Sequence, residues 1–199
     1  MKSRIEIKEQ AKAGFYQQRG IAILAFVLYS VISGVLSGAT VGLAALFLMP
    51  PMTVGYAYFS LRIYRGETSE IMDMLAIGFR DYLKSLVGIL WMMLFTFLWS
   101  LLLIVPGIVK AIAYSMTPYI LAERDDVSAQ DALKLSMDMT YGYKMDIFMM
   151  GLSFIGWWIL SALTFGILAF FFTGPYTATS FAGLYEELKA IQAKEEQMA

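Results

Sequence analysis

Three long stretches without a charged side chain constrain the fold of this sequence most strongly. They cover residues 20–61, 85–109 and 147–185, which are 42, 25 and 39 residues long. After Lys110 the second stretch continues without charge to Ala122. Because about 20 apolar residues suffice for one transmembrane helix, each stretch can form one long span or a hairpin of two. We therefore predict an integral membrane protein.

The composition agrees with a membrane protein and excludes much chemistry. Hydrophobic residues make up 59% of the chain and charged residues 16%, whereas about 25% is charged in a soluble domain. The sequence has no His and no Cys, which excludes disulfides, thiolate nucleophiles, imidazole bases and the usual zinc or haem ligands. The net charge of −1 offers no electrostatic footprint for nucleic acid. We expect no enzymatic activity, cofactor, metal or nucleic-acid partner.

The basic residues distinguish single spans from hairpins. Five precede the first uncharged stretch, four lie in the first connector, three in the second and two in the tail. Single spans would put the four basic residues of the first connector outside the cell, against the positive-inside rule. Hairpins place every polar segment in the cytoplasm and leave only Lys110 near the outer side. Hairpins are therefore favoured.

The predicted fold is an all-α, polytopic transmembrane helical bundle with six spans in three hairpins. The predicted spans are residues 20–38, 42–64, 85–105, 107–124, 147–171 and 175–190. The predicted division is a cytoplasmic amphipathic helix at 1–19, hairpins at 20–64, 85–124 and 147–190, connectors at 65–84 and 125–146, and a tail at 191–199. No removable signal peptide is apparent, so the first span is expected to target the chain, with both termini cytoplasmic.

Two features of these spans leave alternatives open. At about 1.5 Å per residue, residues 107–122 cover only about 24 Å of a core near 30 Å, so the second helix of a hairpin can be tilted or partly inserted. The first block can instead form one long helix over residues 21–49, broken at Pro50-Pro51, with a short returning helix. The sequence does not decide between these arrangements.

Glycine-aromatic pairs recur at a fixed interval and suggest an internal repeat. They lie 64 residues apart each time, at Gly14-Phe15, Gly78-Phe79 and Gly142-Tyr143. A polar, amphipathic stretch precedes each pair, and two of these stretches open with a capping pattern at Ser3 and Ser128. The alternative is that any protein made of helical hairpins needs such connectors and breaks. In either case residues 69–84 and 128–144 are expected to be helical at the cytoplasmic headgroup surface.

Small residues in the first uncharged stretch predict close helix packing. Gly34, Gly38 and Gly42 form two consecutive small-xxx-small steps, which let helix backbones approach each other in lipid. The alternative is that these residues mark the turn of the first hairpin. The partner helix can belong to this chain or to a second subunit.

Lys110 and four tyrosines are the candidate ligand-binding residues. Lys110 is the only charge within an uncharged stretch, and such a residue is by default a functional candidate. Its position one turn after Pro106 favours an interfacial anchor instead. Four tyrosines follow prolines and serve either as belt and packing residues or as the lining of a shared polar cavity. These tyrosines are Tyr56, Tyr114, Tyr119 and Tyr176.

Several segments carry a family resemblance. Pro118-Tyr-Ile-Leu-Ala-Glu-Arg-Asp-Asp, Ala132-Leu-Lys-Leu-Ser, Gly142-Tyr-Lys and Leu152-Ser-Phe-Ile-Gly-Trp resemble the bacterial membrane proteins known as domain of unknown function 975. The resemblance extends over almost the whole chain and implies a multi-pass protein of the bacterial plasma membrane. The family has no established activity, so no catalytic residue is carried over.

Three hypotheses for function follow. The first is a non-enzymatic binding, assembly or accessory component of the cytoplasmic membrane, in contact with the lipid bilayer and with a second copy or a membrane protein partner. The second is a small transporter or lipid-handling protein with a cavity lined by Tyr, Ser and Thr. The third is a membrane-embedded enzyme that uses Asp81, Asp146 or the paired acids of the connectors.

Overall fold

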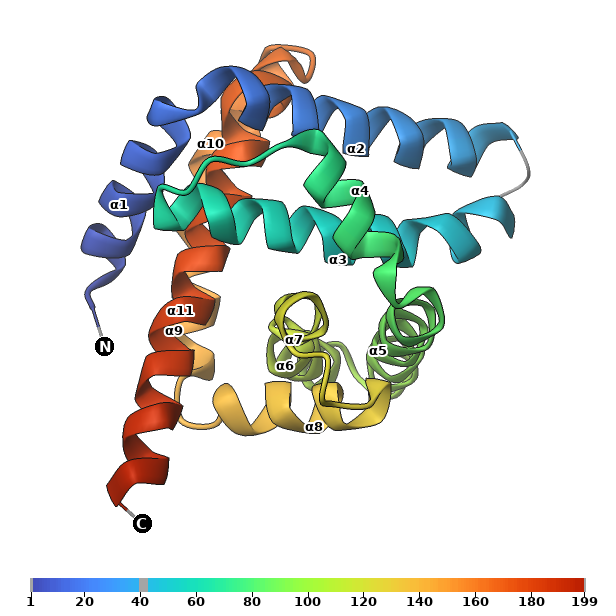
Figure 1. The fold of residues 1–199 in the computed structure, drawn as a ribbon, viewed down its shortest axis with the longest axis vertical. Coiled ribbons are helices and arrows are strands. Elements are labelled where there is room, and N and C mark those ends of the chain that lie inside the picture. The colour runs from blue at the N-terminus through green and yellow to red at the C-terminus, as the bar shows by residue number, and fades with distance from the viewer. Residues whose placement is uncertain (1, 40–42, 199) are drawn as a thin grey trace.

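A computed structural model describes residues 2–39 and 43–198, and every element in this part of the chain is helical (Figure 1). This confirms the predicted all-α class. Three stretches are long and apolar enough to cross a membrane, namely Tyr82–Leu101, Ile104–Glu123 and Lys144–Leu163. A fourth is added if Arg4–Gln17 and Arg19–Gly34, which are bent by 95° relative to each other, count as one span. These stretches support an association with a membrane.

The helices follow one another in three blocks, each a short amphipathic helix and then two longer helical segments. Block 1 contains α1 (Arg4–Gln17), α2 (Arg19–Ala39) and α3 (Leu43–Arg65). Block 2 contains α4 (Ile71–Arg80), α5 (Tyr82–Leu102), α6 (Ile104–Tyr114) and α7 (Thr117–Glu123). Block 3 contains α8 (Ala129–Met139), α9 (Lys144–Leu152), α10 (Ile155–Leu163), the π-helical turn η1 (Ala169–Thr173) and α11 (Gly174–Met198). The order of elements therefore repeats as the glycine-aromatic pairs predicted.

The three repeated glycines nevertheless have different structural roles. A Cβ atom on Gly14 would collide with the carbonyl of Ile63, and one on Gly78 with the carbonyl of Pro51. Both glycines thus allow a helix to cross closely over α3. Gly142 instead has a φ of +84° and open space around it, so it makes a left-handed turn between α8 and α9.

The predicted connector helices and their caps are present. Residues 71–80 and 129–139 are helical, as α4 and α8. The Ser3 side chain accepts a hydrogen bond from the amide of Glu6 at 3.2 Å, and Ser128 accepts one from Asp131 at the same distance. Each bond satisfies an amide of a first helical turn that has no partner inside the helix.

The prolines behave differently from the prediction that they end or kink helices. Pro50 and Pro51 lie inside α3, so the alternative of one helix over residues 21–49 is wrong. Pro106, Pro118 and Pro175 lie in the first turns of α6, α7 and α11. The first turn has free amides in any case, so a proline there loses no hydrogen bond. Pro106 and Pro118 therefore mark helix starts, whereas Pro175 closely follows the π-helical turn η1 and Pro50 and Pro51 lie inside a helix.

One predicted span and the predicted tail also differ in detail. The span over 147–171 is interrupted after α9 and again after α10, where Phe165 and Gly166 have φ values of 52° and 83°. This left-handed backbone cannot continue a helix. The predicted tail at 191–199 is helical to Met198, because α11 extends through it.

The second helices of the blocks form the centre of the molecule. α3 packs against α1, α2, α4, α5, α7 and α11, and one apolar cluster contains buried residues of α3, α7 and α11, such as Leu61, Ile120 and Leu184. The amphipathic helix of each block packs against the second helix of the preceding block. α4 contacts α3, α8 contacts α6 and α7, and α1 contacts α11. The three blocks therefore interlock in a closed ring.

Polar groups of the neighbouring block cover the backbone that is freed inside α3. Pro51 has no amide hydrogen, so it cannot bond to the carbonyl of Phe47 four residues earlier. The hydroxyl of Tyr82, at the start of α5, donates to this carbonyl at 3.2 Å. A side chain of block 2 thus gives a hydrogen bond to a backbone carbonyl of block 1 that has no partner in its own helix.

The break between α6 and α7 is covered in the same way by α8. The Ser136 hydroxyl donates to the carbonyl of Ala113 at 2.8 Å and accepts from the amide of Met116 at 3.2 Å. Non-helical backbone in an apolar segment must be covered by protein, and Ser136 of block 3 provides this cover in block 2.

The break between α9 and α10 is covered by α1. Arg4 donates to the carbonyl of Met149 at 3.4 Å, and the Lys8 ammonium donates to the Ser153 hydroxyl at 3.2 Å. Cations at the carboxyl end of a helix are favourable because the free carbonyls there carry partial negative charge. Block 1 thus completes the ring by covering block 3.

The helix pairs of blocks 1 and 2 run in different directions. In Figure 1 α2 and α3 lie side by side across the view, whereas α5 and α6 are seen end-on. The pair α2–α3 and the pair α5–α6 therefore extend from the shared core in different directions.

Candidate functional site

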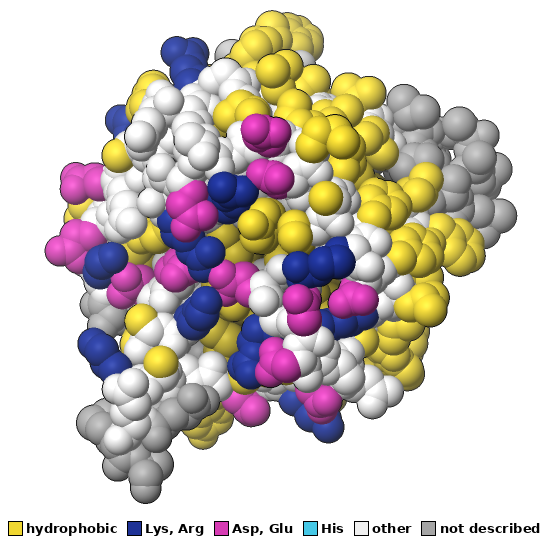
Figure 2. Space-filling view, in the orientation of Figure 1, with side chains coloured by type: hydrophobic (Ala, Val, Ile, Leu, Met, Phe, Trp, Pro, Cys, Tyr) yellow, Lys and Arg dark blue, Asp and Glu magenta, His cyan; other side chains and the backbone are white. Residues whose placement is uncertain are grey.

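The charged side chains gather on one face of the molecule, and hydrophobic side chains surround them along its right and upper margins (Figure 2). We call the charged surface the polar face. It is formed by the carboxyl ends of α3 and α7, the loops that follow them, and the middle of α11. These segments belong to the second helices of all three blocks or directly follow them.

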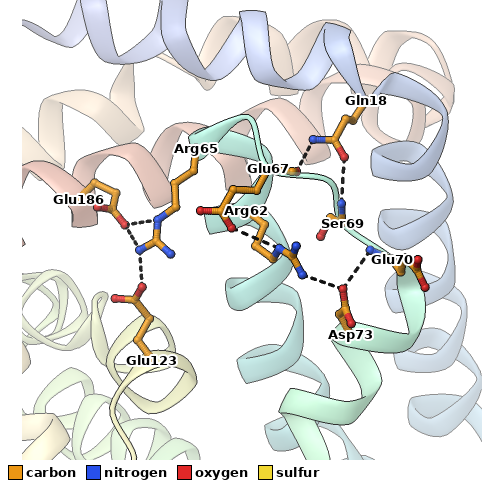
Figure 3. A network of polar contacts seen from close by, with 9 residues as sticks. All are labelled: Gln18, Arg62, Arg65, Glu67, Ser69, Glu70, Asp73, Glu123 and Glu186. Atoms are coloured by element: carbon orange, nitrogen blue, oxygen red, sulfur yellow. Dashed lines mark hydrogen bonds and ion pairs between the residues drawn. The ribbon is translucent and has the colours of Figure 1, made fainter.

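One set of ion pairs joins these three helices, and we call it the Arg65 cluster. The guanidinium of Arg65, the last residue of α3, pairs with the carboxylates of Glu123 on α7 and Glu186 on α11 (Figure 3). Lys189 lies 2.6 Å from the other oxygen of Glu123, and the Tyr185 hydroxyl donates to that oxygen at 3.0 Å. Two acids and two bases are thus mutually neutralised.

The Arg65 cluster is partly shielded from solvent. The side chains of Glu123 and Arg65 are 11% and 27% exposed. Burial on its own would lower the pKa of Arg65, but the hydrogen bonds to Glu123 and Glu186 outweigh it and raise the pKa above its ordinary value. Arg65 therefore remains charged, and removing it would leave two acids without their shared partner.

A second network holds the loop between α3 and α4 (Figure 3). Arg62 lies 2.8 Å from Asp73 and 3.3 Å from Glu67. The Gln18 side chain, at the bend between α1 and α2, donates to the Glu67 carbonyl and accepts from the Ser69 amide at 3.1 Å. The first connector is thereby attached to the bend of block 1.

Further contacts tie the remaining polar segments together. Arg80 pairs with Asp125, and the Lys84 ammonium donates to the carbonyl of Arg124, so the first connector contacts the second. At the amino terminus Lys2 lies 3.0 Å from Glu187 of α11. The polar segments of all three blocks are therefore in direct contact with one another.

A pocket of about 330 Å³ lies between α5, α6 and α8, beside the polar face, and we call it the aromatic pocket. Its lining residues are Trp91, Phe95, Tyr114, Gln130, Leu133, Lys134 and Met137. Its volume lies at the lower end of the range for small-molecule sites.

Lys110 contacts two residues of the aromatic pocket. Its ammonium lies 5.7 Å from the ring centre of Tyr114 and 3.7 Å from the sulfur of Met137. It also lies 5.2 Å from the ring centre of Trp99. Of the five predicted ligand-binding residues, the structure brings Lys110 and Tyr114 together.

The other predicted tyrosines pack against different rings. Tyr56 stacks on Tyr29 with ring centres 4.9 Å apart, and Tyr119 stacks on Tyr185 at 5.4 Å. Tyr176 meets Phe154 edge-on at 5.3 Å. The structure therefore places these tyrosines in packing contacts of the helical core.

The predicted glycine stripe is only partly described. A Cβ atom on Gly34 would meet no atom within 4 Å, so no helix among the described residues approaches closely at that position. The surroundings of Gly38 and Gly42 lie outside the described residues. A role of the stripe in contact with a second chain stays a prediction.

The sequence analysis missed the Arg65 cluster and most of the aromatic pocket. Glu123 directly follows an uncharged stretch and lies inside the segment that carries the family resemblance, which was a usable signal. Trp91 and Phe95 had no such signal, because aromatic residues four apart occur on many apolar helices. Among the described residues no group of three or more acids is placed to hold a metal ion.

Comparison with known proteins gives one match. Residues 101–192 match the model of a family described as protein of unknown function, DUF975. This confirms the predicted resemblance over α6 to α10 and most of α11. No curated protein and no solved structure matches the chain.

Proposed function

We propose that this DUF975 family member, recognised by its residues 101–192, is a non-enzymatic assembly or binding component of the cytoplasmic membrane that docks a partner on its polar face. In this proposal six spans form three hairpins and both termini lie in the cytoplasm. The observation that carries it is the set of ion pairs that joins the polar segments of all three blocks.

Ion pairs between connectors support the hairpin arrangement. Arg65, Glu123 and Glu186 follow or end three different apolar segments, and their side chains are in direct contact. A contact of this length cannot extend across a hydrocarbon core about 30 Å thick, so all three residues belong on one side of the membrane. Each apolar segment between them then begins and ends on that side.

The charge pattern favours the cytoplasm for this side. Every basic residue except Lys110 lies outside the three uncharged stretches and their continuation to Ala122, and basic residues concentrate on the cytoplasmic side. The remaining surface supports insertion, because α5 and α6 expose large apolar side chains such as Phe97, Leu101 and Ile104. Such a surface is stable in lipid and would aggregate in water.

The state of the charges supports binding rather than catalysis. A catalytic acid or base needs a proton that it can exchange with substrate, whereas Glu123 and Glu186 are engaged by Arg65 and Lys189. A groove of about 140 Å³ between α8 and α11 is lined by residues that include Tyr141, which is 78% exposed. Exposed aromatic residues of this kind are frequent anchors in protein interfaces.

Cysteine accessibility tests the arrangement, since the chain has no native Cys. Single substitutions at Glu67, Asp126 and Leu103, which lies between α5 and α6 and is 67% exposed, are labelled in intact cells with a membrane-impermeant maleimide. We expect labelling of Leu103→Cys alone, with Glu67→Cys and Asp126→Cys reacting only after the cells are opened. Labelling of Glu67→Cys from outside would refute the arrangement.

Site-specific photocrosslinking tests the docking role. A photoreactive phenylalanine derivative replaces Tyr141, in the groove that α8 forms with α11 next to the polar face, or, as the matched control, Phe97 on the exposed face of α5. We expect one discrete protein adduct from position 141 and none from position 97. Adducts from both positions, or from neither, would contradict docking at the polar face.

A second candidate function, lipid handling, is favoured by the aromatic pocket. This pocket joins apolar walls from α5 and α6 to the ammonium of Lys110. Of the four tyrosines predicted to line a shared cavity, this pocket contains Tyr114 alone.

A further inference from the structure

Lys110 is a cation with an incomplete environment. It interrupts the apolar segment Ile104–Glu123, and its side chain is half-buried. Its ammonium faces two aromatic rings and a thioether, and no carboxylate of the described residues lies within ion-pair distance. Charged side chains in apolar segments ordinarily pair with an opposite charge or with backbone carbonyls. An anionic ligand would complete this environment.

The aromatic pocket adjoins this ammonium. Tyr114 and Met137 contact Lys110 and also line the pocket, so the pocket and the cation form one continuous site. Trp91, Phe95 and Leu133 supply its apolar walls. A ligand that fills this site has an apolar part next to a negative charge.

The rim of the aromatic pocket is polar. Gln130 and Lys134, both on α8, are exposed where the pocket opens. Lys134 lies 3.5 Å from Asp131, and its side chain is 69% exposed, so this ammonium can turn toward a ligand. The pocket is therefore apolar inside and polar at its rim, where Gln130 supplies an amide and Lys134 an ammonium group.

We propose that the aromatic pocket and Lys110 bind one anionic glycerophospholipid, with an acyl chain against Trp91 and Phe95 and the phosphate on Lys110. The lipid reaches the site from the bilayer, because α5 and α6 expose apolar side chains beside it, Phe97 at 63% and Val109 at 40%. The negative phosphate complements the unpaired ammonium. Lipid binding at this site does not require a docked protein partner. The lipid proposal can therefore be refuted without refuting the docking role of the polar face, and the reverse is also true.

Fluorescence quenching tests this site in the full-length protein. Trp99, Trp157 and Trp158 are changed to Phe, which leaves Trp91 as the only tryptophan. The protein is reconstituted in phosphatidylcholine vesicles that contain a small, equal fraction of either brominated phosphatidylglycerol or brominated phosphatidylcholine. We expect at least twofold stronger quenching by the brominated phosphatidylglycerol. Equal quenching by both lipids would overturn the proposal.

Two substitutions assign the preference to Lys110. In the single-tryptophan background, Lys110→Met is expected to abolish the difference between the two lipids, and Lys110→Arg to retain it. Lys194→Met, at the exposed end of α11, is the control and is expected to change nothing. A preference that survives in Lys110→Met, or that is lost equally in Lys194→Met, contradicts the proposed site.

A competition experiment with Lys110 unchanged provides a test that does not depend on whether Lys110→Met folds. Unbrominated phosphatidylglycerol is expected to relieve the quenching, whereas millimolar sodium phosphate is not. Relief by sodium phosphate would identify free phosphate as the ligand and overturn the lipid assignment. Failure of unbrominated phosphatidylglycerol to compete would also overturn it.

Discussion

Helices α3 and α5 are similar in length and both are rich in apolar residues, yet their surroundings are opposite. In the second half of α3, Leu61 and Ile63 are at most 1% exposed, whereas Phe97 and Leu101 in α5 are 63% and 74% exposed. The apolar side chains of α3 contact protein, and those of α5 are available to lipid. Apolarity alone therefore does not decide what a helix faces.

The different surroundings of α3 and α5 follow from a glycine and a proline in α3, which change how closely a neighbouring helix can approach and which backbone groups are free. α3 contains Gly55 and Pro51, and a Cβ atom on Gly55 would collide with the Met74 carbonyl of α4. In lipid, where apolar burial does not drive helices together, such close approach provides the contacts that hold them. α5 carries large side chains over most of its length and meets the other helices along one side. Features that allow close approach thus identify the central helix.

The largest expected effect on stability comes from blocking the close contact between α3 and α4. Gly55→Ala should prevent α4 from approaching and lower the free energy of unfolding by about 2–3 kcal/mol, as overpacking commonly does. SDS titration of the purified protein in detergent micelles measures this. The matched control is Gly156→Ala on α10, where a Cβ would meet no atom within 4 Å. The control is expected to be neutral or stabilising by up to about 1 kcal/mol. Equal destabilisation in both variants would remove the distinction.

The next effect concerns the polar end of α3. Arg65→Met leaves Glu123 and Glu186 without their shared cation, and we expect a loss of about 2 kcal/mol, less than for a fully buried pair because the side chains are partly exposed. Arg80→Met is the control, because its pair with Asp125 has 40% and 62% exposed side chains. It is expected to cost at most about 1 kcal/mol. The same SDS titration compares the two, and a larger cost at Arg80 would contradict the central role of the Arg65 cluster.

A smaller effect is expected where α8 covers the break between α6 and α7. Ser136→Ala leaves the Met116 amide unpaired in a buried position, which costs about 1–2 kcal/mol. Ser100→Ala removes only a bond from an exposed side chain to the carbonyl of Thr96 in its own helix, and should be nearly neutral. Hydrogen exchange around residue 116 gives a direct readout. Unchanged protection there in Ser136→Ala would show that α8 does not cover the break.

The smallest effect is expected at the amino end of α8. Ser128→Ala removes the cap, which costs about 1 kcal/mol. Hydrogen bonding by Ser128 holds the pKa of the Asp131 carboxyl below its usual value. The stabilising effect of ionised Asp131 is therefore present above its ordinary pKa and is lost as the pH falls through the lowered value. Helicity followed by circular dichroism should decrease at low pH in the wild type and less so in Ser128→Ala. The same decrease in both proteins would contradict this cap.

Much of the fold follows from the sequence for identifiable reasons. The long uncharged stretches predict the helices, and the bounds of α2, α3 and α5 lie within three residues of the predicted spans. Ser3 and Ser128 predict two helix starts, because capping is a local interaction. The 64-residue interval predicts the order of elements in the three blocks. All of these signals depend on residues close together in the chain.

The features that the sequence analysis missed depend on distant residues. The bond from Tyr82 to the Phe47 carbonyl joins residues 35 apart, and the pair of Arg65 with Glu186 joins residues 121 apart. Pro51 signals that a carbonyl is freed, but not whether the helix ends or a neighbour satisfies it. Lys110 was recognisable as an unusual charge, whereas its contact with Met137 required the position of α8. Ring-like interlocking of the blocks is therefore visible only in three dimensions.

The central claim is that the connectors of different blocks meet on one side of the membrane, and crosslinking of Arg80→Cys with Asp125→Cys tests it most directly. The chain has no other Cys, so cells that express the double variant are treated with a short bis-maleimide and the linked peptides are identified by mass spectrometry. We predict an intramolecular link between residues 80 and 125 that is absent from both single variants. Absence of the link, together with labelling of the two cysteines from opposite sides of the membrane, would contradict this account.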